Sequence, residues 1–378
     1  MSIGTHDIKD LSLNPKRLLE KFDSADQHLA KRKSGPHMRW MAEHADDEKL
    51  IFPKWDLSNG VPTFARSWTD FESGLAVIVG QPNSGKTTIL VSLHTGSLEL
   101  NDDTIIVDIS LDDPIRKRYV QWLANLSGLR YSEVSSPSSL TTPQTRLLDA
   151  AKEKLRGWVS DGRLFPFESQ ETSLVGVKHR NIDGVDAIRN EVRKFNTRHY
   201  QTLLNLMRRF RDKYPDKKII FTIDAWNNLD YTSAHGSSDL TQMNFMLDAI
   251  QEVSNQEEIK VIVSAHARKT MNKRVTLEDI KGTKNMEYNC VWGGVVRNEY
   301  RENVYLEPLI YTDGDRDYPV LTIEIGKTKV SSWDMPLFYA LMSDQCRLKP
   351  LTTYEYETMM QMYQGSNRKM KGGGPTGP

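Results

Sequence analysis

The residues most able to do chemistry in this chain lie together in residues 80–88, GQPNSGKTT. They fit the pattern G-x-x-x-x-G-K-[ST]. The apolar run 75–79 before them predicts a buried strand, and residues 88–93 after them suit a helix. A glycine-rich turn between a strand and a helix presents backbone N–H groups and the positive end of the helix dipole to an anion. The chain is therefore predicted to bind a nucleoside triphosphate.

Two side chains of this P-loop (residues 80–87) have specific expected roles. Lys86 would reach the β- and γ-phosphates, and the Thr87 hydroxyl would hold Mg²⁺. ATP and Mg²⁺ are accordingly the expected cofactors. The predicted nucleotide contacts are Gly80, Pro82, Asn83, Ser84, Gly85, Lys86, Thr87 and Thr88.

Carboxylates follow two further apolar runs. Residues 218–224, KIIFTID, predict a strand that ends in Asp224, which would hold the water shell of Mg²⁺ at the carboxyl edge of a sheet. An Asp at a strand end can instead cap a helix, but the P-loop upstream favours the metal role. Residues 105–109 lead into Asp112 and Asp113. Either carboxylate could orient the water molecule that hydrolysis requires.

Strands and helices are expected to alternate along the chain from residue 75. The expected strands are residues 75–79, 104–109, 163–167, 218–224, 259–264, 290–296 and 320–325, and the expected helices are residues 114–129, 146–159 and 184–213. Such alternation predicts an α/β fold, a P-loop NTPase core with a mostly parallel central sheet flanked by helices. Pro166 restricts the strand that contains it to an edge of the sheet.

Four parts are expected along the chain. Residues 1–69 form a short N-terminal extension, either a linker or a helical arm that docks on a neighbouring subunit. Residues 70–345 form the ATPase core, and residues 346–364 form a C-terminal helix or extension. Residues 365–378 are rich in Gly, Lys and Pro and are expected to be a disordered tail.

The composition limits the classes of function. Of the 378 residues, 50 are basic and 50 are acidic, so any nucleic-acid contact has to come from a local basic patch. No apolar stretch approaches the roughly 20 residues of a transmembrane helix, and the first residues lack the apolar core of a signal peptide. The only cysteines are Cys290 and Cys346. We expect a reducing, cytoplasmic location, in a bacterial or phage-infected cell, with no membrane partner.

Three motifs resemble the RecA-like core of the DnaB family of hexameric replicative helicases and its phage and mitochondrial relatives. Residues 110–114, SLDDP, are similar to the family's Ser-Leu-Glu-Met-Pro, in which the Glu is the catalytic base, and Asp112 takes its position. Residues 224–229 resemble the family's Asp-Tyr-Leu-Gln-Leu. Residues 263–269 resemble the segment that carries a γ-phosphate sensor, and His266 takes that role. The resemblance implies that Lys86, Asp112, Asp224 and His266 form one hydrolytic site.

Two further segments resemble functional segments of the same family. Residues 276–283 are similar to part of its central DNA-binding loop, and a basic stretch precedes them. A plain solvated loop is the alternative for this region. The resemblance implies DNA contacts by Arg268, Lys269, Lys273, Arg274, Lys281, Gly282 and Lys284. Residues 325–329, IGKTK, resemble Gly-Lys-Gln-Arg-Asn-Gly, so Lys327 and Lys329 are expected to reach the ATP of a neighbouring subunit.

The family resemblance implies an ATP-dependent DNA helicase or translocase. It would act on single-stranded DNA in replication as a homo-hexameric ring, with a primase, polymerase or loader as further partners. Two departures weaken the match. Asp112 is shorter by one methylene than the family's Glu, and Lys329 replaces an Arg that donates a bidentate fork. The alternatives are a slow regulatory or loader ATPase of KaiC or RecA type, and an ATP-gated DNA-binding assembly that does not unwind.

Overall fold

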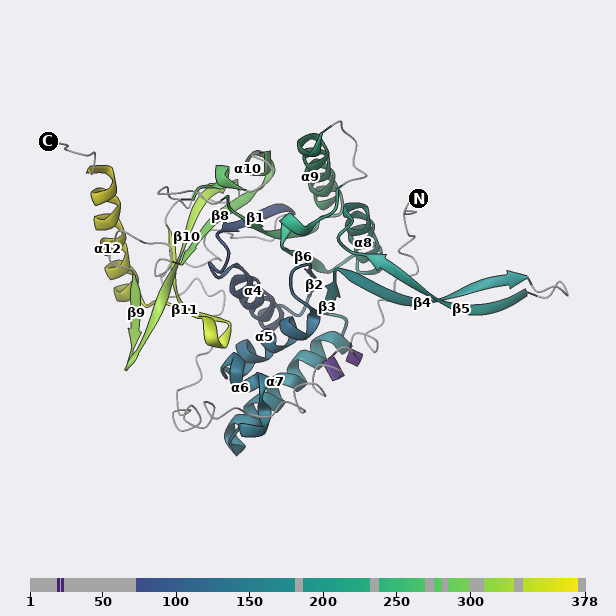
Figure 1. Cartoon of the computed structure of the whole chain (residues 1–378), viewed down its shortest axis with the longest axis horizontal. Coiled ribbons are helices and arrows are strands. Elements are labelled where there is room, and N and C mark those ends of the chain that lie inside the picture. The colour runs from purple at the N-terminus through teal and green to yellow at the C-terminus, as the bar shows by residue number, and fades with distance from the viewer. Residues whose placement is uncertain are drawn as a thin grey trace.

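The computed structural model describes residues 19–20, 22–23, 73–180, 186–231, 238–268, 275–280, 285–298, 309–329 and 336–372. Within these residues the chain forms a ten-stranded sheet and a separate two-stranded hairpin (Figure 1). The strand order of the large sheet is β12-β11-β10-β8-β1-β7-β6-β2-β3, and β9 pairs with β10 outside this path.

Six neighbouring strands of the large sheet run parallel. They are β8 (Trp292–Asn298), β1 (Gly74–Gly80), β7 (Lys260–His266), β6 (Lys218–Asp224), β2 (Thr104–Ser110) and β3 (Leu164–Glu168). Their apolar runs are continuous because strands of this kind are buried on both faces. The predicted α/β core is confirmed, and β3, which contains Pro166, lies at the end of the sheet as expected. We call the edge where these strands end the carboxyl edge, and the opposite one the amino edge.

The other strands of the large sheet are antiparallel to their neighbours. They are β9 (Ile310–Asp313), β10 (Arg316–Thr328), β11 (Leu337–Met342) and β12 (Arg347–Pro350). Because β10 runs against β8, Lys327 pairs with Gly293 near the start of β8. The end of β10 therefore lies at the amino edge.

Helices cover both faces of the sheet (Figure 1). On one side lie α4 (Lys86–Leu100), α5 (Ile115–Ser127), α6 (Tyr131–Ser135) and α7 (Thr142–Ser160), and on the other lie α8 (Tyr200–Lys213) and α9 (Asp239–Gln256). The alternation of β1 explains this arrangement. Ala76 and Ile78 belong to a buried cluster with residues of α4, while Val77 and Val79 belong to another that includes residues of α9.

The hairpin consists of β4 (Gln170–Arg180) and β5 (Asp186–Asn196), which pair antiparallel along their whole length. It projects from the body of the molecule beside β3 (Figure 1). The predicted helix over residues 184–213 is therefore wrong in its first half, since α8 begins only at Tyr200. Residues 186–196 contain Ile188, Val192 and Phe195, which favour strands once a partner strand is present. The pattern of one segment does not reveal that partner.

Both chain ends contact the core. Phe22 is fully buried and stacks on Tyr119 of α5 with ring centroids 4.6 Å apart. The predicted docking of this segment on a neighbouring subunit stays a prediction, as does the division of the chain into four parts. Helix α12 (Thr353–Gly372) follows β12, and its residues Tyr356 and Met359 pack in a third buried cluster with Phe338. None of the described helices is long and apolar enough to span a membrane.

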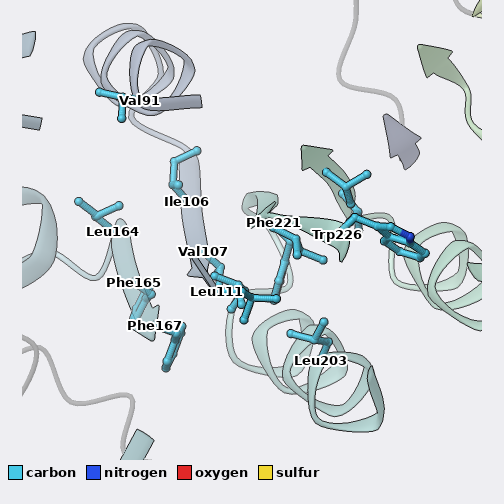
Figure 2. Packing of buried hydrophobic residues seen from close by; sticks show 14 of the residues in the cluster. Val91, Ile106, Val107, Leu111, Leu164, Phe165, Phe167, Leu203, Phe221 and Trp226 are labelled. Atoms are coloured by element: carbon cyan, nitrogen blue, oxygen red, sulfur yellow. The ribbon is translucent and has the colours of Figure 1, made fainter. Parts of the chain in front are cut away.

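The core beneath the carboxyl edge is built from side chains of both helical layers (Figure 2). Val91 comes from α4, Val107 and Phe221 come from the neighbouring strands β2 and β6, and Leu203 comes from α8. Leu111 follows β2 directly and is buried in the same cluster. This burial anchors the loop that carries the next residue, Asp112.

Candidate active site

The P-loop connects the end of β1 to the start of α4. A hydrogen bond from Ser84 N to the Gln81 carbonyl, 3.2 Å long, closes the turn. Gly85 has φ of 98°, and a Cβ there would lie 2.5 Å from Leu321 Cδ1. At Gly80 a Cβ would lie 2.7 Å from the Val296 carbonyl oxygen. The two glycines of the motif are therefore required by the backbone conformation and by close packing.

The donors of the P-loop suit a polyphosphate. Helix α4 starts at Lys86 without a side-chain cap, and Ser84 Oγ is buried with no hydrogen-bond partner in the described part of the chain. The Lys86 side chain curls over the turn, and its Nζ donates to the carbonyls of Gly80 (2.9 Å) and Gln81 (2.7 Å). Pro82 and Asn83 are exposed at the tip. Uncapped N–H groups beside a lysine form the arrangement that binds phosphate at a helix start.

Asp224 lies directly beside the P-loop. Thr87 Oγ1 donates to Asp224 Oδ2 at 2.9 Å, and Ser264 of β7 donates to Oδ1. Burial by itself raises the pKa of the Asp224 carboxyl, but the Arg118 guanidinium and the hydrogen bonds from Ser264, Arg118 and Thr87 outweigh it. The pKa is therefore lower than usual, and the group is ionised at neutral pH. Thr87 and Asp224 together fit the ligand shell of Mg²⁺.

Across the described residues, no three His, Cys, Asp or Glu side chains cluster as a metal site. Mg²⁺ typically binds one or two carboxylates together with substrate phosphates. The pair of Thr87 and Asp224 fits that mode, in which the nucleotide supplies the remaining ligands.

Asp112 lies in the loop after β2 and faces the site. The backbone N–H groups of Leu111 and Asp112 donate to the Asp224 carbonyl at 2.6 and 3.2 Å, which fixes the loop against the end of β6. Asn228 Nδ2 donates to Asp112 Oδ1, and His266 Nε2 lies 3.8 Å from Oδ2. The Asp112 side chain is 49% exposed, so water can reach it.

Asp113, the second candidate carboxylate, is engaged elsewhere. Its carboxylate pairs with Lys117 of α5 at 2.7 Å, and its carbonyl accepts a hydrogen bond from Ser110 Oγ at 2.6 Å. Of the two carboxylates that the sequence left open, Asp112 is the one beside His266 and Asp224.

His266 ends β7 at the position paired with Gly80 of β1. Its backbone N–H donates to Asn227 Oδ1 at 2.7 Å. Burial lowers the pKa of His266, and the charge of Lys86 lowers it further, against the opposing charges of Asp112 and Asp224. The ring is therefore neutral at pH 7. A neutral imidazole at this position can hydrogen-bond to a phosphate or to water without adding charge.

The predicted DNA-contacting residues fall mostly outside the described residues. These are Lys269, Lys273, Arg274, Lys281, Gly282 and Lys284. Arg268 is described; its side chain is exposed, and its backbone N–H donates to the Asp279 carbonyl at 2.7 Å. Ala267 forms an isolated bridge with Ile280. The chain therefore leaves residues 268 and 280 at neighbouring points beside the end of β7.

Lys327 and Lys329 lie at the amino edge, away from the P-loop of the same chain. Lys327 Nζ donates to the carbonyls of Glu287 and Tyr288 in α10 (Asn285–Asn289), the second at 2.7 Å. The Lys329 side chain is exposed, and its backbone N–H donates to the Val291 carbonyl at 2.8 Å. The structure thus brings Lys86, Thr87, Asp112, Asp224 and His266 together but not these two lysines.

Sequence reasoning missed Arg118, Asp108 and Asn228. Arg118 is fully buried, and its Nη2 lies 2.8 Å from Asp224 Oδ2. A signal was present, because Arg118 falls between Ile115 and Trp122 on the apolar stripe of α5, and Asp108 interrupts the apolar run of β2. A cation in a buried helix stripe and a carboxylate in a buried strand indicate an internal ion pair.

No protein-family model matches the chain, and none of the curated proteins matches it in sequence. Solved structures share its fold. The ATPase domain of one DnaB-like replicative helicase matches with a TM-score of 0.55 and 13% identity, over 74% of this chain and 85% of that one. A second DnaB-like replicative helicase, studied with its interactions with primase, matches with a TM-score of 0.59 and 12% identity, over 85% of this chain and 68% of that one. The predicted RecA-like fold of DnaB-type helicase ATPase domains is confirmed.

Proposed function

We propose that this chain is an ATPase that hydrolyses ATP with Mg²⁺ at the carboxyl edge and uses the energy to move along single-stranded DNA. The observation that carries the proposal is the Thr87–Asp224 hydrogen bond, with Lys86, Asp112 and His266 around it. A phosphate cradle, a metal pair and a water-accessible carboxylate are the parts that phosphoryl transfer to water requires. Here they come from the ends of four parallel strands.

Each residue has a distinct task in the proposed mechanism. Lys86 and the start of α4 bind the β- and γ-phosphates, and Thr87 and Asp224 hold Mg²⁺, which neutralises phosphate charge when bound. Asp112, oriented by Asn228, accepts a hydrogen bond from the attacking water. His266, neutral at pH 7, responds to the γ-phosphate, and Asn227 holds its backbone.

A homo-hexameric ring follows from the position of Lys327 and Lys329 within this proposal. The two lysines lie at the amino edge, so they reach a nucleotide only if it belongs to another subunit. Exposed Arg268, next to the neutral His266, offers a DNA contact close to the γ-phosphate site. The fold neighbour studied with primase supports a role in replication, with a primase, polymerase or loader as partner, in the cytoplasm.

The test combines three measurements on the purified full chain. ATP turnover is measured with and without single-stranded DNA, the native mass is measured in parallel, and a forked duplex tests unwinding. Turnover stimulated by DNA, a hexameric mass and unwinding are the expected results. Absence of Mg²⁺-dependent turnover would contradict the ATPase, and turnover indifferent to DNA would contradict the translocase.

One observation favours a second function, that of a slow regulatory or loader ATPase. Asp112 stands where the helicases have Glu, and it is half exposed in the loop. A carboxylate one methylene shorter reaches about 1.5 Å less far, and misplacement by about 1 Å can cost 10²-fold in rate. Turnover that is slow and unaffected by DNA would favour this function. Tight ATP binding without turnover would instead favour an ATP-gated DNA-binding assembly.

A further inference from the structure

A buried arginine links the proposed metal site to the interior of the sheet. Arg118 of α5 is 0% exposed and lies between two carboxylates on neighbouring strands. Its Nε is 3.0 Å from Asp108 Oδ2 on β2, and its Nη2 donates to Asp224 Oδ2 on β6 at 2.8 Å. The guanidinium therefore bridges the metal-binding carboxylate to a second one that does not reach the site.

Asp108 is in turn held by a directional chain of hydrogen bonds. Trp122 Nε1 donates to His94 Nδ1 at 3.2 Å, which places the ring proton on Nε2. His94 Nε2 then donates to Thr222 Oγ1 at 2.9 Å, and Thr222 donates to Asp108 Oδ1 at 2.8 Å. Arg118 is anchored on a carboxylate that cannot rotate.

The anchored guanidinium fixes the orientation of Asp224. Oδ2 of Asp224 accepts hydrogen bonds from Arg118 and from Thr87 (2.9 Å), while Oδ1 accepts one from Ser264. Three donors on two oxygens define the plane of the carboxylate. Without Arg118, only the two short hydroxyl side chains would hold it.

The Arg118 cluster is poorly explained as a stabilising device. Burying three charged groups costs several kcal/mol per ion, and replacing such clusters by neutral groups is often neutral or stabilising. Arg118 Nη1 also has no hydrogen-bond partner among the described residues. An imperfectly satisfied ion cluster that ends on Asp224 is better explained by the geometry that it imposes there.

We propose that Arg118 is a positioning residue, which holds the Asp224 carboxylate in the orientation needed for the Mg²⁺ ligand shell. This inference rests on the proposed ATPase function. It predicts that loss of the clamp weakens the steps that require the metal and leaves metal-free nucleotide binding unchanged. A merely structural arginine would not separate the two.

The test is the double variant Arg118→Gln with Asp108→Asn. It removes one positive and one negative charge, so the net charge of the cluster stays the same and Asp108 is not left buried and unpaired. Three quantities are measured on the full chain. These are kcat with Mg²⁺, the Kd for a fluorescent ATP analogue in EDTA, and the Kd for Mn²⁺, followed by electron paramagnetic resonance with a non-hydrolysable ATP analogue. We expect kcat to fall about 10²-fold, Mn²⁺ to bind about tenfold more weakly, and the Kd in EDTA to change less than about twofold.

Arg211→Gln is the matched control. Arg211 donates to backbone carbonyls of Glu257 and Pro215 at the amino edge, so its loss should lower stability without changing Mn²⁺ affinity. Unchanged Mn²⁺ affinity in the double variant would overturn the proposal, as would parallel loss of Mn²⁺ and metal-free nucleotide binding. If the wild type hydrolyses no ATP, the ATPase proposal fails, and the Mn²⁺ comparison still decides the role of Arg118. A wild type that binds neither nucleotide nor Mn²⁺ removes both.

Discussion

The two edges of the parallel sheet both carry buried or half-buried cations, but those cations have different partners. At the carboxyl edge, Arg118 contacts side chains, and Lys86 contacts carbonyls of the P-loop itself. At the amino edge, Arg211 donates to carbonyls of the turns around residues 214–217 and 257–258, and Lys327 donates to those at the end of α10.

This difference shows what a basic residue does in this fold. Carbonyls at the ends of helices and in turns need donors, so the cations of the amino edge satisfy the backbone. In contrast, the carboxyl edge gathers Thr87, Asp112, Asp224 and His266, whose polar groups point into one space. The direction of the strands, rather than the number of charges, separates the site from the scaffold.

The largest effect is expected from Lys86→Ala. Lys86 is 5% exposed and is the cation beside the uncapped start of α4, so its loss removes the main charge that would face the phosphates. ATP turnover should fall about 10³-fold, and nucleotide affinity should fall with it. Turnover and the binding of a fluorescent ATP analogue measure both effects. Lys217→Ala, an exposed lysine at the amino edge, is the control and should leave both quantities unchanged. Equal effects of the two substitutions would erase the distinction between the edges.

The next largest effect is expected from Asp112→Asn. An amide cannot accept the water proton, so kcat should fall about 10²-fold while nucleotide affinity stays within about twofold. Asp113→Asn provides the matched control. Asp113 pairs with exposed Lys117, and such a pair contributes about 0.5 kcal/mol, so kcat should change less than about threefold. A larger loss in Asp113→Asn than in Asp112→Asn would reverse the assignment of the two carboxylates.

Much of the parallel half of the sheet could be predicted because its strands are continuous apolar runs. The expected strand at residues 218–224 coincides with β6, and its last residue is Asp224. Motif spacing also identified the residues around Thr87 that the structure brings together.

The parts that could not be predicted depend on contacts between distant segments. Residues 186–196 form a strand only because residues 170–180 pair with them. The contact of Arg118 with Asp224 depends on how α5 lies across β2 and β6. The edge at which Lys327 lies depends on β10 running against β8, and a strand pattern carries no direction.

A smaller effect, on stability, is expected from the chain of hydrogen bonds beneath the carboxyl edge. Burial lowers the pKa of His94 from 6.5 to about 4, against the opposing charge of Asp108. The unfolded chain therefore binds a proton between pH 6.5 and 4 that the folded chain does not, and stability falls as the pH drops through this range. Between pH 7 and pH 5 the loss from His94 should be about 2 kcal/mol. Urea unfolding at the two pH values measures it. His94→Gln should show a loss smaller by that amount, and an equal loss would show that His94 is not the titrating group.

The smallest effect is expected from Lys329→Ala, and it separates the edges most directly. The Lys329 side chain is exposed at the amino edge, so its removal should change the nucleotide affinity of the chain by less than about twofold. If Lys329 acts on the ATP of a neighbouring subunit, turnover in mixtures with wild type should fall more steeply than the fraction of variant chains. Loss strictly in proportion to that fraction would remove the role between subunits. Reduced affinity in the isolated chain would show that the amino edge contributes to the site of its own subunit, which the antiparallel course of β10 argues against.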